Sequence, residues 1–91
     1  MYEDTLVAAS FDAARHANQT SRGHVAACAA QASAERAIER AVHAATGIDV
    51  VVNAWPDILR VRVRETGARV ELRAPLTFAD VVEATRGLVV R

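Results

Sequence analysis

The sequence contains no lysine and only one cysteine, Cys28, in 91 residues. A single cysteine cannot form an intramolecular disulfide, and three scattered histidines beside it do not provide the spacing of a metal-binding motif. We therefore predict no metal site, no cofactor and no catalytic residue, and expect a non-enzymatic protein. Basic and acidic residues number 11 each, so the formal net charge is zero and no overall field attracts the chain to nucleic acid or to a membrane.

Long apolar runs are also missing. No segment approaches the roughly 20 apolar residues that a membrane-spanning helix requires. The opening residues, MYEDTLVAAS, lack the basic region with which a secretory signal begins. We therefore expect a cytoplasmic protein that does not bind membranes. The length is that of a single domain with a modest core.

The apolar residues that are present divide the chain into two halves. They make up 52% of the sequence, but twenty of them are alanine, and the first 46 residues contain few bulky side chains. This half has high helix propensity, no proline, and apolar residues at helical spacing. The pattern predicts helices over 3–18 and about 23–46, the second ending at Gly47 in the left-handed conformation.

The second predicted helix is lined mostly by alanine, which allows another helix to approach closely. We expect residues 1–46 to form a helical hairpin, or a helix pair shared between two chains. If two chains share the helix pair in a homodimer, the self-association surface would be formed by Val25, Ala29 and Ala32.

After Gly47 the apolar residues change from a helical period to the alternation of strands. This alternation predicts strands over 48–53, 58–65 and 68–74. A last helix follows, for which Thr77 and Asp80 form a partial capping box and which Gly87 ends.

The predicted order is therefore α-α-β-β-β-α, a single domain of the α+β class over residues 1–91. Residues 1–46 form the helical hairpin. Residues 47–91 form an antiparallel three-stranded meander and the last helix, with helices over one face of the sheet.

Five arginines alternate with Leu and Val between residues 58 and 73, which places them on the face opposite the core. We predict hairpin loops at 54–57 and at Thr66-Gly67. In that register Arg62 lies between two acids, whereas four arginines oppose one another without an acid. The opposed pairs are Arg60 with Arg73 and Arg64 with Arg69.

Like charges directly opposite each other destabilise a sheet. Three explanations remain open for these four arginines. Water and salt screen them, or acidic residues of another protein or of a second copy cover them, or phosphates do so, since guanidinium groups match phosphate geometry. We predict a partner-binding surface made of Arg60, Arg64, Arg69, Arg73 and the loop residue Trp55.

The expected function is that of a small protein-binding regulator, either an accessory regulator or a phage-type inhibitor of a larger complex. The alternative is a nucleic-acid-binding module that uses the four arginines on phosphates. From residue 24, the order α-β-β-β-α resembles the layout of double-stranded-RNA-binding domains. The resemblance is one of topology, because the last helix, TFADVVEATR, carries Asp80 and Glu83 where those domains are basic, and the strands lack stacking aromatic residues.

Overall fold

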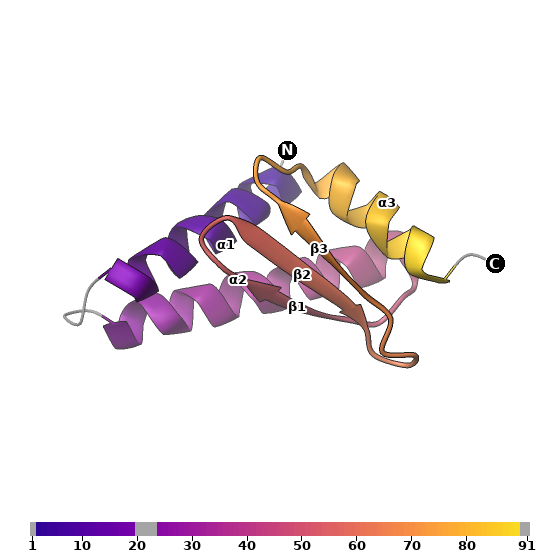
Figure 1. The fold of residues 1–91 in the computed structure, drawn as a ribbon, viewed down its shortest axis with the longest axis horizontal. Helices are drawn as coiled ribbons and strands as arrows, with labels where there is room; N and C mark the ends of the chain where they lie inside the picture. Colours follow the sequence, from indigo (N-terminus) through magenta and orange to yellow (C-terminus); the bar gives the residue numbers. More distant parts are fainter. Residues whose placement is uncertain (1, 20–23, 90–91) are drawn as a thin grey trace.

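The described part of the chain folds into three helices and one three-stranded sheet, in the predicted order and of the predicted α+β class (Figure 1). The computed structural model describes residues 2–19 and 24–89, and their side chains except those of residues 18, 19 and 24–27. The elements are α1 (Tyr2–Gln19), α2 (His24–Thr46), β1 (Val50–Ala54), β2 (Ile58–Val63), β3 (Arg69–Arg73) and α3 (Phe78–Val89).

The sheet has the order β1-β2-β3, with both neighbouring pairs antiparallel. One face, the inner face, packs against the helices, and the strands lie across α1 and α2 in Figure 1. The side chains that β1 and β2 place on the inner face are all buried: Val50, Val52, Ala54, Leu59, Val61 and Val63. The opposite side, the outer face, carries Val51, Asn53, Ile58, Arg60, Arg62, Arg69, Glu71 and Arg73.

The helices complete the core with narrow stripes of apolar side chains. In α1, Val7, Phe11 and Ala14 recur at helical spacing and are at most 5% exposed. In α2 the buried residues Ile38 and Val42 are one turn apart, and α3 adds its buried valine, Val81.

The buried stripe of α2 is not the one that alanine content suggested. Ala34, which is 8% exposed, and Ile38 face the core. Ala29 and Ala32, predicted to mediate self-association, lie on the exposed side of α2. The third predicted residue, Val25, lies outside the described side chains. These alanines therefore do not pack on the chain's own core, and self-association through them remains a prediction.

Both predicted caps are present, but α3 is longer than expected. Gly47 has a φ of 75° and donates its N–H to the carbonyl of His43 at 2.7 Å, which ends α2. Thr77 and Asp80 form the capping box, with N···O distances of 3.0 and 3.2 Å. Gly87 does not end α3, because its φ is not positive and the next two residues pack against the core. A cap that the sequence did not reveal comes from α1, where Asp4 accepts the N–H of Phe78 at 2.7 Å.

The register of both hairpins differs from the prediction by two residues. Trp55 donates its N–H to the carbonyl of Ile58 at 2.8 Å, so the first loop is two residues shorter than expected. Val63 donates to the carbonyl of Ala68 at 2.7 Å, so the second loop, 64–67, is two residues longer. In that loop Gly67 has a φ of 79°, in the left-handed region that glycine adopts without strain. An even shift preserves which side chains face inward, but it changes every cross-strand pair on the outer face.

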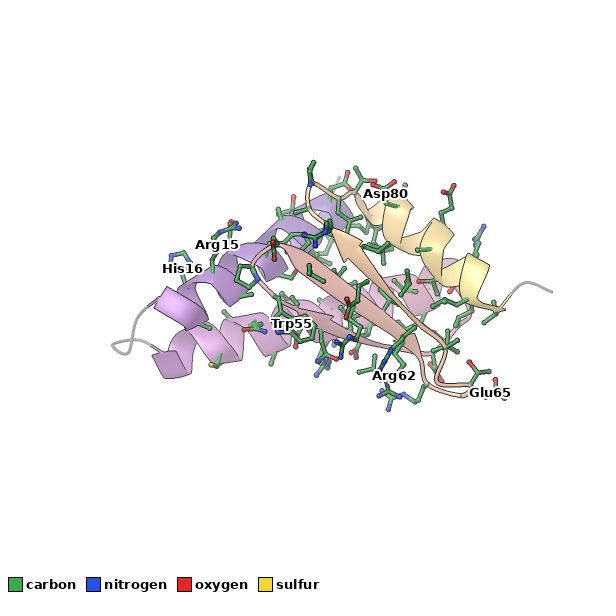
Figure 2. The ribbon with its side chains drawn as sticks, in the orientation of Figure 1. Arg15, His16, Trp55, Arg62, Glu65 and Asp80 are labelled. Atoms are coloured by element: carbon green, nitrogen blue, oxygen red, sulfur yellow. The ribbon has the colours of Figure 1, made fainter. Side chains whose placement is uncertain are left out.

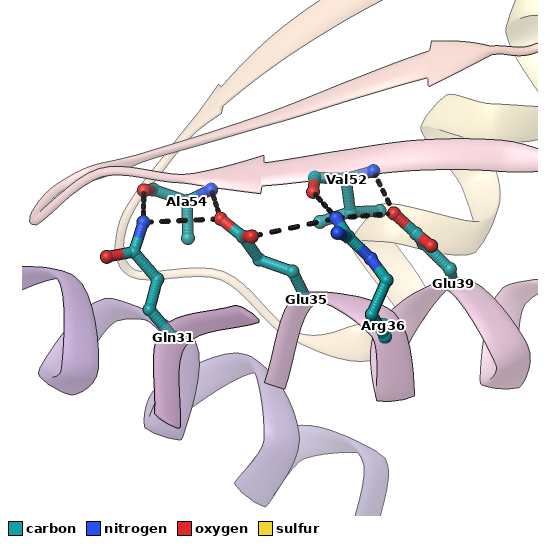
Figure 3. Close-up of polar contacts among 6 residues, drawn as sticks. All are labelled: Gln31, Glu35, Arg36, Glu39, Val52 and Ala54. Atoms are coloured by element: carbon teal, nitrogen blue, oxygen red, sulfur yellow. Dashed lines mark hydrogen bonds and ion pairs between the residues drawn. The ribbon is translucent and has the colours of Figure 1, made fainter. Parts of the chain in front are cut away.

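The free edge of β1 is closed by side chains of α2 (Figure 3). The backbone groups of Val52 and Ala54 point away from β2, as alternate residues of an edge strand do. Glu39 Oε2 accepts the N–H of Val52 at 2.8 Å, and Glu35 Oε2 accepts the N–H of Ala54 at 2.7 Å. Two carboxylates one helical turn apart thus replace the carbonyls of a missing strand.

Two further side chains of α2 serve the carbonyl groups of the same edge. Gln31 Nε2 donates to the Ala54 carbonyl at 2.8 Å, and Arg36 Nη2 donates to the Val52 carbonyl at 2.8 Å. Arg36 Nη2 also lies 2.8 Å from Glu39 Oε2, so the guanidinium balances the charge of that carboxylate. The outward groups of Val52 and Ala54 on this edge are therefore satisfied in both their donors and their acceptors.

The contact of Glu35 with this edge predicts a loss of stability on substitution. Glu35 is 6% exposed, so Glu35→Ala leaves the N–H of Ala54 buried without an acceptor. We expect the free energy of unfolding to fall by about 2–3 kcal/mol, and Glu35→Gln, which keeps an oxygen acceptor, to lose less. Urea unfolding provides the measurement. Glu83→Ala, at an exposed position of α3, is the control, and equal midpoints for the two alanine variants would contradict this role of Glu35.

Candidate functional site

The outer face of the sheet is the surface that the helices leave uncovered. All three helices pack on the other side, and of the helices in the described residues none crosses the outer face. It carries four arginines and one glutamate, so its electrostatics depend on which arginines have an acidic neighbour.

At the end of the outer face near the first loop, Arg60 is neutralised. Its Nε and Nη2 donate to Glu71 Oε2 at 3.1 and 2.8 Å, because the observed register places Glu71 directly opposite. The guanidinium carbon also lies 4.9 Å from the centroid of the Trp55 ring, which is a cation–π distance. The prediction that Arg60 opposes Arg73 without an acid is therefore wrong.

Arg73 also has an acidic neighbour, although a more distant one. Its Nη1 lies 3.9 Å from Asp57 Oδ2, and both side chains are largely exposed. Such a contact adds little to stability in water. It does place a carboxylate beside Arg73, whose strand partner is Ile58 and not another arginine.

The other end of the outer face is where positive charge remains unbalanced. Arg62 lies between Val51 of β1 and Arg69 of β3, so neither cross-strand neighbour is acidic. Val63 and Ala68 form a hydrogen-bonded pair, and such pairs alternate with non-hydrogen-bonded pairs along antiparallel strands. Arg62 and Arg69 therefore form a non-hydrogen-bonded pair, in which the two side chains lie closer together. No carboxylate of the described residues lies within ion-pair distance of either guanidinium, and Figure 2 shows Arg62 pointing away from the helices.

Arg64 extends this charge beyond the strands. The prediction placed it opposite Arg69, but the longer second loop removes it from the β2–β3 ladder, and its N–H instead donates to the carbonyl of Asp49 at 3.0 Å. Its side chain is exposed at the end of the sheet. We call Arg62, Arg64 and Arg69 the arginine patch.

The sequence therefore placed these arginines on the outward face, but the observed register changes which of them lack an acidic neighbour. The arginine patch shares Arg64 and Arg69 with the predicted contact surface and adds Arg62, to which the predicted register gave two acids. Trp55 is 41% exposed, and its role as a contact residue stays a prediction. Loop length was the missing information, and no residue in either loop specifies it unambiguously.

Other kinds of site find no support in the part of the chain that the structure describes. It has no group of three or more His, Cys, Asp or Glu side chains that could hold a metal ion. A shallow hollow beside Trp55 includes Glu35 and Gln31, but their polar atoms already bond the edge of β1. Among the described helices, none has the length and apolar character needed to cross a membrane. No protein family, curated protein or solved structure matches this chain.

The opposed pair predicts that one substitution in the patch stabilises the fold. In Arg62→Glu the new carboxylate faces Arg69, so we expect the free energy of unfolding to rise by a few tenths to about 1 kcal/mol at low salt. Arg60→Glu is the matched control, on the same strand and face, and is expected to destabilise because its carboxylate faces Glu71. Urea unfolding at low and high salt separates the two, and a loss of stability in both variants would contradict the observed register.

Proposed function

We propose that this chain is a small non-enzymatic binding protein whose arginine patch contacts an acidic surface of another protein. The observation that carries the proposal is the opposed pair Arg62 and Arg69 on an uncovered face, with no carboxylate of the described residues within ion-pair distance of either guanidinium. Carboxylates of a partner would convert this repulsion into charge-assisted hydrogen bonds, which guanidinium groups form in a bidentate manner.

The Trp55 end of the face supports the same proposal. Trp55 and Arg60 stack at 4.9 Å, and both residue types are enriched among the side chains that dominate protein–protein binding energy. Because Glu71 already holds Arg60, the ring and the guanidinium are ordered before a partner arrives. Pre-ordered side chains lose less conformational entropy on binding.

The charge distribution favours a protein over a nucleic acid. Acids flank the patch, with Glu65 in the second loop and Glu71 between Arg60 and Arg73 on the same face. A phosphate backbone following the outer face would meet these carboxylates, and the net charge of zero provides no compensating attraction. An acidic protein surface with a few basic residues of its own complements this mixture better.

The test compares two double variants with the same change in charge. Arg62→Ala with Arg64→Ala removes two patch residues, and Arg40→Ala with Arg86→Ala removes two exposed arginines of α2 and α3. Each protein is used to capture proteins from a nuclease-treated extract of the source cells, and the captured acidic protein is then purified and titrated at two salt concentrations. We expect binding to the wild type and to the helix variant, and at least about tenfold weaker binding to the patch variant.

Two results would overturn this proposal. The first is capture of the same protein by both variants with equal affinity. The second is binding of the wild type to duplex or single-stranded oligonucleotides with a salt dependence that falls in the patch variant, which would indicate phosphate contacts.

A further inference from the structure

The sheet has a second edge, on β3, that residues 2–19 and 24–89 leave open. Ala68 accepts a backbone hydrogen bond from Val63, and Ala74 donates one to Asp57, at 2.7 and 2.9 Å. Even-numbered residues of β3 therefore bond β2, and the backbone groups of Arg69, Glu71 and Arg73 point outward. In the described residues we find no hydrogen bond to these outward groups, in contrast to the closed edge of β1.

The core is also incomplete beside this edge. The inner-face side chains of β2, Leu59 and Val61, are 0% exposed, whereas those of β3, Val70 and Leu72, are only partly buried. α3 contacts both strands but does not fully cover β3. Apolar side chains and unpaired backbone groups thus coincide at one edge, which is the combination that an added strand would bury.

We propose that a second copy of this chain pairs its β3 antiparallel with this edge, around a two-fold axis at Val70. In this register Arg69 lies opposite the partner's Glu71, and Glu71 lies opposite the partner's Arg69. The two Val70 side chains meet on the inner face. Arg69 and Glu71 form hydrogen-bonded pairs with the partner's Glu71 and the partner's Arg69, about four backbone bonds in all. The product is a continuous six-stranded sheet.

Charge complementarity and the position of Pro75 together select this register over its neighbours. An axis at Glu71 would place the two Glu71 carboxylates opposite each other and Arg69 opposite the partner's Arg73. An axis at Leu72 would pair Glu71 with the partner's Arg73, but it would place Pro75, which has no N–H, opposite the partner's Arg69. Of these three axes, only the one at Val70 pairs opposite charges and places no proline opposite an outward residue.

The proposal is argued from the edge of β3 and not from the partner proposed above, but the two share Arg69, whose side chain lies on the outer face and would gain the partner's Glu71 as an acidic neighbour. In the paired sheet Glu71 contacts its own Arg60 on one side and the partner's Arg69 on the other. Arg62 and Arg64 of both copies remain uncovered on one joined outer face.

The experiment measures molar mass by light scattering for matched variants of the full chain. Arg69→Glu and Arg62→Glu make the same change in charge in the same opposed pair, and each leaves one arginine facing one glutamate within the chain. Only Arg69→Glu changes the edge, where it faces the partner's Glu71. We expect a dimer of the 9.8 kDa chain for the wild type and for Arg62→Glu, and a dimer Kd raised at least about tenfold for Arg69→Glu.

A charge exchange and an amide measurement complete the test. Arg69→Glu combined with Glu71→Arg restores opposite charges across the edge, so it should restore the dimer. The amide of Glu71 should exchange with solvent more slowly in the dimer than in the Arg69→Glu monomer. A wild type that stays monomeric at high concentration, a dimer that Arg69→Glu leaves intact, or a double variant that stays monomeric would each overturn the proposal.

Discussion

The fold depends on the hydrogen bonds from one face of α2 to the edge of β1. A three-stranded sheet has two edges, and each edge residue that points outward needs a partner for its N–H and C=O groups. Glu35 and Glu39 provide acceptors, and Gln31 and Arg36 provide donors. Because four polar side chains must meet two residues of a strand, α2 is fixed in position along the sheet as well as against it.

This constraint determines which surfaces remain available. With α2 bonded to one edge and the three described helices packed on the inner face, none of the described elements covers the outer face or the edge of β3. The charge on that surface is polarised along the strands, with Arg60 neutralised at one end and Arg62 opposed to Arg69 at the other. The two proposals use these two surfaces, one for a different protein and one for a second copy.

Sequence patterns were sufficient for the elements and for the inner face, because both depend on periodicity alone. Val61 faces inward in any register that shifts by two. The cross-strand pairs depended on loop lengths, and the loops around Pro56 and Gly67 each allow more than one closure. The role of Glu35 could not be predicted either, since a glutamate among alanines on a long helix is typical of a solvated face, and no local pattern indicates a strand edge beside it.

The evenness of the register shifts has an evolutionary consequence. A change of two residues in a hairpin loop that shifts the register leaves Val50, Val61 and their neighbours in the core, yet it changes the partners of Arg60 and Arg62. Such a shift alters which guanidinium lacks an acidic neighbour without altering the set of residues in the hydrophobic interior. Loop length can therefore change the charge pattern of the outer face while every strand residue stays the same.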